Sequence, residues 1–165
     1  MRNPIRPVVL LICIVALTNV LQGCSSVSNL TKRLNPFYTA NALQSLQVVS
    51  QEDANFGYAV AMDIVFIEDE QKAKTIGQLT ASQWFNSKKR EFSSECPGEV
   101  CIKHIELMPS DVKTISLPEK HRLAKSVLVF VWYLQEPKLN RFDISTFEHA
   151  RVTLQYSTIR VEKVQ

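Results

Sequence analysis

A group of acidic side chains has the types and spacing that could do acid and base chemistry. Glu68, Asp69 and Glu70 form an acidic run, and Asp63 precedes them inside an apolar segment. Two carboxylates could move a proton on a substrate if one of them were removed from water. The simpler expectation places the run at the start of a helix, where it favours the positive helix terminus. The exposure preference of Asp favours an edge or solvent-facing position for Asp63, since a buried carboxylate needs a partner.

The rest of the sequence holds no recognisable catalytic or metal-binding motif. His104, His121 and His149 lie in separate segments, and none is followed by a His or Cys at the spacing that metal sites use. Nucleophile elbows, phosphate-binding glycine loops and His-Glu-x-x-His sequences are absent. We therefore expect no enzyme, no catalytic residue, no metal, no cofactor and no small-molecule substrate. Asp63, Glu68 and Asp69 keep a glycan- or lipid-directed hydrolase or binding module open as an alternative.

Cys24 ends a segment that predicts lipid attachment. Arg2 and Arg6 precede the apolar run from Pro7 to Leu21, which is too short for a stable transmembrane helix and has the layout of a signal peptide. Leu21-Gln22-Gly23-Cys24 resembles the bacterial lipobox, whose cysteine is acylated before cleavage. We therefore expect a signal peptide over 1–23 and a covalent lipid on Cys24 that anchors the protein to a membrane. The alternative is an uncleaved membrane anchor with an incidental cysteine.

The residue after this cysteine bears on localisation. In lipoproteins of this kind an aspartate there usually causes retention at the inner membrane, and this chain has Ser25. The resemblance therefore implies the outer membrane, with the domain in the periplasm. Loss of 1–23 would also leave the chain nearly neutral, and its densest basic cluster, 88–90, is typical of a solvated helix face. No nucleic-acid partner is expected.

Cys96 and Cys101 remain as a pair in an oxidising compartment. Pro97-Gly98 between them is a turn that can bring two Cα atoms within the roughly 4.4–6.8 Å of a disulfide. We expect a Cys96–Cys101 disulfide. A metal pair is the weaker alternative, because only His104 lies nearby in the sequence.

Apolar periodicity divides the remaining chain into a spacer and one domain. Residues 24–42 are polar and predict a flexible lipidated spacer, and 43–165 predict a periplasmic β domain with a helical insertion at about 70–93. Strands are predicted over 43–50, 58–67, 100–107, 112–117, 125–134, 140–144 and 150–161, the last with a bulge, and helices over 70–76 and 81–92. Six or seven strands with short turns indicate an antiparallel β-sandwich.

Aromatic residues suggest where this sandwich is buried and where it binds. The pairs Trp84-Phe85 and Trp132-Tyr133 could line a pocket, but their burial area makes core positions the better expectation. Phe56 differs, because it lies in the polar connection Gln51-Glu52-Asp53-Ala54-Asn55-Phe56-Gly57. An aromatic residue on a loop of a rigid scaffold is typical of partner binding, and folding back onto the sandwich edge is the open alternative.

The order of these features resembles the TssJ family, the outer-membrane lipoproteins of type VI secretion systems. The features are the lipobox, the spacer, the strands around Gln51–Gly57, the helix with Trp84-Phe85, and the strand Ser126 to Tyr133 followed by Arg141-Phe142. The resemblance implies a transthyretin-like sandwich that anchors a secretion complex to the outer membrane. It also implies docking of an inner-membrane, TssM-like protein through the loop Gln51 to Gly57. A pilotin or assembly lipoprotein of another secretion or pilus system is an alternative, as is an envelope glycan-binding module.

Overall fold

The computed structural model describes residues 40–92, 98–118, 121–135 and 139–164. They belong to the second of two compact units, Thr39–Gln165. In these ranges, the helices are all too short or too polar to cross a membrane. The predicted spacer over 24–42 reaches into the described part: Asn41 N donates to Ala124 O (2.9 Å) and Ala42 N to Ser145 O (2.7 Å). The folded chain therefore begins before Leu43.

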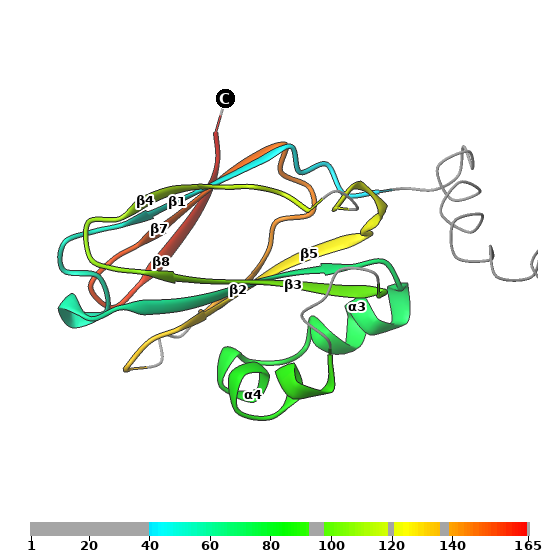
Figure 1. The fold of residues 1–165 in the computed structure, drawn as a ribbon, viewed down its shortest axis with the longest axis horizontal. Helices are drawn as coiled ribbons and strands as arrows, with labels where there is room; N and C mark the ends of the chain where they lie inside the picture. The colour runs from blue at the N-terminus through cyan, green and yellow to red at the C-terminus, as the bar shows by residue number, and fades with distance from the viewer. Residues whose placement is uncertain (1–39, 93–97, 119–120, 136–138, 165) are drawn as a thin grey trace, which may run out of the picture. The chain divides into compact units, whose positions relative to one another are not determined.

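Two four-stranded sheets pack face to face in this unit (Figure 1). The first has the order β4-β1-β7-β8, with strands β1 (Ser45–Ser50), β4 (Val112–Ile115), β7 (His149–Leu154) and β8 (Ile159–Lys163). The second has the order β3-β2-β5-β6, with strands β2 (Val60–Ile67), β3 (Val100–Leu107), β5 (Ser126–Trp132) and β6 (Arg141–Asp143). The predicted mainly-β sandwich is confirmed.

The burial pattern of the strands explains their sequences. In β1, every second residue is buried, and Leu46 and Val48 point into the core between the sheets. β2 is apolar on both faces because its outer face is covered as well: Val65 and Ile67 belong to a second core, beneath the helices. The strand predicted over 58–67 is thus present as β2, covered on both faces.

The helical insertion lies on the outer face of the β3-β2-β5-β6 sheet, as Figure 1 shows. It consists of α3 (Glu70–Ile76), α4 (Ala81–Asn86) and the 3-10 turn η3 (Lys88–Glu91). A capping box of Thr80 and Gln83 begins α4. The helix predicted to reach Phe92 is wrong in length, because it ends at Asn86. There the Ser87 hydroxyl donates to Gln83 O (2.8 Å), a local bond that competes with helix continuation.

Two features of the strands differ from the prediction. The described part of the chain forms eight strands, because the single bulged strand predicted over 150–161 is a hairpin of β7 and β8. The turn of this hairpin is closed by Gln155 N donating to Thr158 O (3.0 Å). The parity switch in the sequence therefore marks a turn. In addition, β1 pairs with β7 in parallel, so the sandwich is not purely antiparallel.

Candidate functional site

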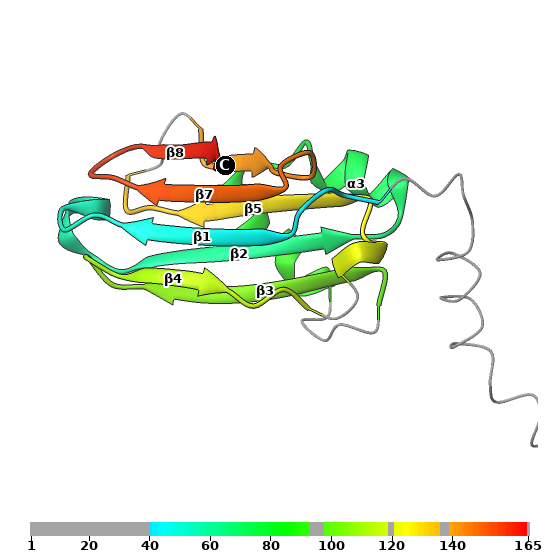
Figure 2. The same ribbon diagram turned by 90° about the horizontal axis from the view of Figure 1, so that it is seen from above.

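The loops at one end of the sandwich contain the predicted partner-binding segment. β1, β3, β5 and β7 end there, and Figure 2 shows the β1–β2 connection at this end together with the β3–β4 and β7–β8 turns. We call the described segments 51–59, 108–111, 133–135 and 155–158 the loop end. At the opposite end the chain enters β1, and Gln44 N donates to Glu148 O (2.7 Å).

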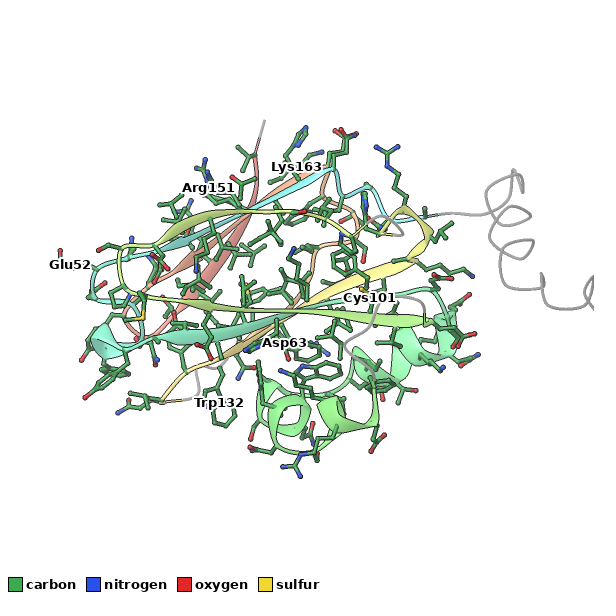
Figure 3. The ribbon with its side chains drawn as sticks, in the orientation of Figure 1. Glu52, Asp63, Cys101, Trp132, Arg151 and Lys163 are labelled. Carbon is green, nitrogen blue, oxygen red and sulfur yellow. The ribbon has the colours of Figure 1, made fainter. Side chains whose placement is uncertain are left out.

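The predicted loop Gln51–Gly57 divides into an exposed and a buried part. Gln51, Glu52 and Asp53 are exposed, and Figure 3 shows Glu52 at the end of the molecule away from α3. Ala54 and Asn55 are buried in the short 3-10 segment η2 (Ala54–Gly57). The loop therefore presents its acidic residues to solvent and uses the following ones to hold its shape.

The backbone of this loop takes an unusual course. Asn55, Phe56 and Gly57 have φ angles of 50°, 61° and 81°, all in the left-handed region. Asn and Gly tolerate this region, whereas a Phe there costs roughly 1–2 kcal/mol. Phe56 is half-buried, and its ring lies 4.3 Å from that of Tyr156 in an edge-to-face contact. Phe56 therefore folds back onto the β7–β8 turn, as the alternative reading of the sequence proposed.

The buried side chain of Asn55 joins the β1–β2 loop to the segment after β5. Its Oδ1 accepts from Leu134 N (2.7 Å), and its Nδ2 donates to Ala59 O (2.8 Å). Its backbone N donates to Gln155 O in the β7–β8 turn (3.3 Å). A buried amide that uses both ends of its side chain rigidifies the backbone around it.

Further bonds tie the remaining loops together. Tyr133 donates its hydroxyl hydrogen to Gln155 O (2.9 Å), and burial raises the pKa of this hydroxyl to about 12. Ser110 N donates to Gln51 O (3.4 Å), joining the β3–β4 turn to the β1–β2 loop. Asp111 accepts from Met108 N (3.0 Å) within that turn, a bond that, with Lys113, holds the pKa of its carboxyl low. The four loops thus form one hydrogen-bonded unit.

The loop end also exposes large apolar side chains, which the sequence reading did not identify. They are Tyr58, Met108, Leu134 and Tyr156 in the loop end, with Val112, Trp132 and Leu139 beside it. All but Tyr156, which falls inside the strand predicted over 150–161, lie in or beside a predicted turn or strand end, where apolar residues are unusual. That position is the signal by which the sequence could have revealed them. Of the four aromatics expected in the core, Trp84 and Tyr133 are buried, Phe85 is half-buried and Trp132 is exposed.

A buried charge lies in a second region, between the helical insertion and the sheet. Asp63 in β2 has no exposed surface, so the edge or solvent-facing position expected for it is wrong. Its carboxylate accepts from Trp84 Nε1 (2.9 Å) on α4, and Lys89 Nζ of η3 lies 2.9 Å from Oδ2. His104 Nδ1 of β3 lies 2.5 Å from Oδ1. Asp63 occupies a central strand, and hydrogen-bond donors from α4, η3 and β3 take the place of the water that would otherwise solvate its carboxylate.

This cluster does not form an acid–base pair with the acidic run. Asp63 is separated from Glu68 by the remainder of β2, about 16 Å at 3.3 Å per residue. Asp69 caps α3 by accepting from Lys72 N (2.8 Å). On the outer side of His104, Nε2 lies 3.8 Å from Glu106 Oε1, and within the described ranges no hydroxyl or thiol forms a hydrogen bond with it. The geometry is that of a satisfied buried charge.

The other predicted sites are only partly described. Cys24, Ser25 and Cys96 lie outside the described residues, so lipidation, sorting and the Cys96–Cys101 pairing stay predictions. Cys101 is buried in β3. Over the described ranges, the His, Cys, Asp and Glu side chains form no group of three or more that could hold a metal ion.

Comparisons with known proteins give matches in structure only. No protein-family model matches the sequence, and no curated protein sequence does so at a significant level. The type VI secretion lipoprotein TssJ1 from Pseudomonas aeruginosa aligns with a TM-score of 0.56 and 9% identity, over 73% of this chain and 95% of that one. Lip from Serratia marcescens, a membrane-bound component of the type VI secretion system, gives 0.51 and 12%, over 72% and 96%.

A third match belongs to the structure of the TssM C-terminal domain from EAEC, with a TM-score of 0.53 and 13% identity over 72% of this chain and 98% of that one. Nearly all of the matched chain aligns with less than three quarters of this one, so the matched chain is about as long as the present domain. It is therefore shorter than the TssM segment 869–1107 for which that structure is named. Since this third structure is named for TssM, the likeness to TssJ is argued from the TssJ1 and Lip structures alone. At these identities the likeness concerns the fold, and the domain has a TssJ-like fold.

Proposed function

We propose that this protein is a structural lipoprotein that anchors a type VI secretion membrane complex to the outer membrane. In this proposal acyl chains on Cys24 hold the protein in the membrane, and Ser25 permits sorting to the outer membrane. The domain then docks the periplasmic part of a TssM-like inner-membrane protein through Gln51–Gly57. The TssJ-like fold supports this assignment.

The observation that carries the proposal is that the chain enters the domain at one end of the sandwich and the loop Gln51–Gly57 lies at the other. The chain that follows Cys24 enters the fold at Asn41 and Ala42, and β1 then leads directly to Gln51. The six residues of β1 span about 20 Å. A lipid-tethered domain built in this way presents its docking loop at the end that lies farthest from the point of chain entry.

The test is affinity purification of the natively lipidated full-length protein from solubilised envelopes, with mass spectrometry of what co-purifies. We expect a large inner-membrane protein together with secretion-sheath or baseplate components. The charge reversals Glu52→Lys and Asp53→Lys should lower its recovery at least tenfold. Glu148→Lys, an exposed change at the opposite end, is the matched control and should retain the wild-type recovery. Recovery of the protein alone or with an outer-membrane ring would contradict this proposal and favour the pilotin or glycan-binding alternatives.

The anchor is tested separately by metabolic labelling with a palmitate analogue. The wild-type protein should carry the label and fractionate with the outer membrane. Cys24→Ser should lose the label. An unlabelled wild-type protein would contradict the lipoprotein assignment without bearing on the docking loop.

A further inference from the structure

Apolar side chains that face solvent gather at a single end of the domain. Seven large apolar residues are exposed among those described: Tyr58, Met108, Leu134 and Tyr156 lie in the loop end, and Val112, Trp132 and Leu139 lie beside it. In the connections, the exposed fractions reach 62% for Tyr58, 60% for Met108 and 61% for Leu134. Single exposed apolar residues are normal on a soluble domain, but a cluster at one place indicates an interaction surface.

The backbone that presents these side chains is already fixed. Asn55 holds the peptide of Leu134, and Tyr133 holds Gln155 next to Tyr156. The β3–β4 turn with Met108 is joined to Gln51 and closed by Asp111. A surface that is ordered before binding loses little conformational entropy in the complex. The loop end therefore has the rigidity of a preformed docking platform.

The charges beside this surface indicate the kind of partner. Glu52 and Asp53 are exposed, and neither forms an ion pair within the described ranges. The basic groups nearby are neutralised: Lys113 Nζ lies 3.2 Å from Asp111, and Arg160 lies 2.9 Å from Glu162. An acidic border repels an anionic lipid surface, and end-to-end contact of two copies would bring like charges together. Both features favour a protein with basic residues.

We infer that the loop end is one composite docking surface, in which Tyr58, Met108, Leu134 and Tyr156 contact an apolar patch on a folded protein partner. Lysine or arginine residues of that partner face Glu52 and Asp53. The inference rests on the proposed function, because it assigns this surface to the same partner. It extends the interface from the β1–β2 loop to three further connections.

The experiment places a photo-crosslinking amino acid in the full-length lipidated protein, one position at a time. The positions are Asp53 in the loop, and Met108, Leu134 and Tyr156 outside it. Thr146, exposed at the opposite end, is the control position. After irradiation of intact cells, the crosslinked products are isolated and the partner peptide at each position is sequenced.

We expect Asp53, Met108, Leu134 and Tyr156 to capture the same protein, and Thr146 not to capture it. The peptides captured at Met108 and Leu134 should be apolar, and those captured at Asp53 should contain lysine or arginine. A crosslink from Asp53 without one from Met108 or Leu134 would leave the proposed function intact and overturn the composite surface. Absence of the partner at all four positions would overturn both. Products with the mass of two copies of this chain would overturn the inference in favour of self-association.

A second measurement tests the energetic contribution of the surface. The double change Met108→Ser and Leu134→Ser should lower recovery of the captured protein at least tenfold, with thermal unfolding unchanged. Thr146→Ser is the matched control. Unchanged recovery would overturn the inference. The inference would also be overturned, in favour of a lipid surface, if the wild-type domain bound phosphatidylethanolamine–phosphatidylglycerol vesicles and the double variant did not.

Discussion

The carboxylate of Asp63 and the apolar side chains of the loop end depart in opposite directions from the usual distribution of residues between core and surface. Asp63 is a charge without exposed surface, whereas Tyr58, Met108 and Leu134 are large apolar groups that are more than half exposed. Asp63 has hydrogen-bond donors from Trp84 and Lys89. Its burial is therefore compensated inside the domain, and removal of the carboxylate would leave these donors without this acceptor.

The loop end lacks such compensation. Its backbone polar groups are paired through Asn55 and Tyr133, but the apolar side chains they position have solvent on one side. The favourable free energy of burying them is still available for binding. The comparison teaches that the two regions should respond differently to substitution: the Asp63 region through stability, and the loop end through association.

The largest effect is expected at Trp84, the fully buried ring that donates to Asp63 and stacks 4.8 Å from Phe130. Trp84→Ala should lower the free energy of unfolding by about 3–5 kcal/mol, measured by urea denaturation of the full-length protein in detergent. Trp132→Ala, at the exposed tryptophan, is the control and should lose about 1 kcal/mol. Equal losses would show that the insertion does not pack as a second core.

Removal of the buried charge itself sharpens the comparison. Asp63→Ala leaves Trp84 Nε1 and Lys89 Nζ without their acceptor and should lower the unfolding free energy by about 3 kcal/mol. The estimate is at the low end for a buried pair because Lys89 is 30% exposed and can regain water. Glu106→Ala, on the exposed side of His104, should change it by less than about 0.5 kcal/mol. A neutral Asp63→Ala would exclude a stabilising role.

Asn55 should affect both stability and docking, because it supports the loop end from within. Asn55→Ala removes the bonds to Leu134 and Ala59 and should lower the unfolding free energy by about 1–3 kcal/mol. Partner recovery should fall as well, even at temperatures where the variant is folded. Asp53→Ala should leave stability unchanged. Normal recovery with Asn55→Ala would show that the docking surface needs no preorganisation.

Tyr133 gives the smallest effect at neutral pH and a distinct one in alkali. Tyr133→Phe should lower the unfolding free energy by about 1 kcal/mol at pH 7. Burial raises the pKa of Tyr133 in the folded domain to about 12, above its usual 10.0. Because the folded domain favours the protonated hydroxyl, this group contributes its full share to the unfolding free energy below pH 10. That contribution is lost as the pH rises from 10 toward 12. Tyr133→Phe should remove this loss of stability in alkali. The measurement is the urea midpoint of unfolding, which should no longer fall between pH 10 and 12 in the variant.

Much of the fold follows from local sequence patterns. The strands predicted over 43–50 and 125–134 and the start of the helix predicted at 81 each depend on residues close in the chain, and the structure has β1, β5 and α4 at these places. The errors have long-range causes. The parallel pairing of β1 and β7 joins residues about a hundred positions apart, and the β7–β8 turn resembled a bulge because both shift the parity of apolar residues.

The candidate sites show the same division. The polar loop Gln51–Gly57 could be identified from its composition, but the inward fold of Phe56 onto Tyr156 depends on a distant turn. The position of Asp63 was predicted wrongly because exposure preferences average over contexts. Only the fold places Lys89 and His104 where a buried carboxylate is stable.

By itself, the sequence determined the mainly-β architecture, the extent of the helical insertion from Glu70 onward and the existence of a polar loop after the first strand. These properties arise from period, capping and turn chemistry, which act over a few residues. Only the tertiary structure decided that four connections form one end, that their apolar side chains face solvent together, and that Asp63 is enclosed. The physical reason is that burial and hydrogen bonding depend on which distant segments the sheets bring together.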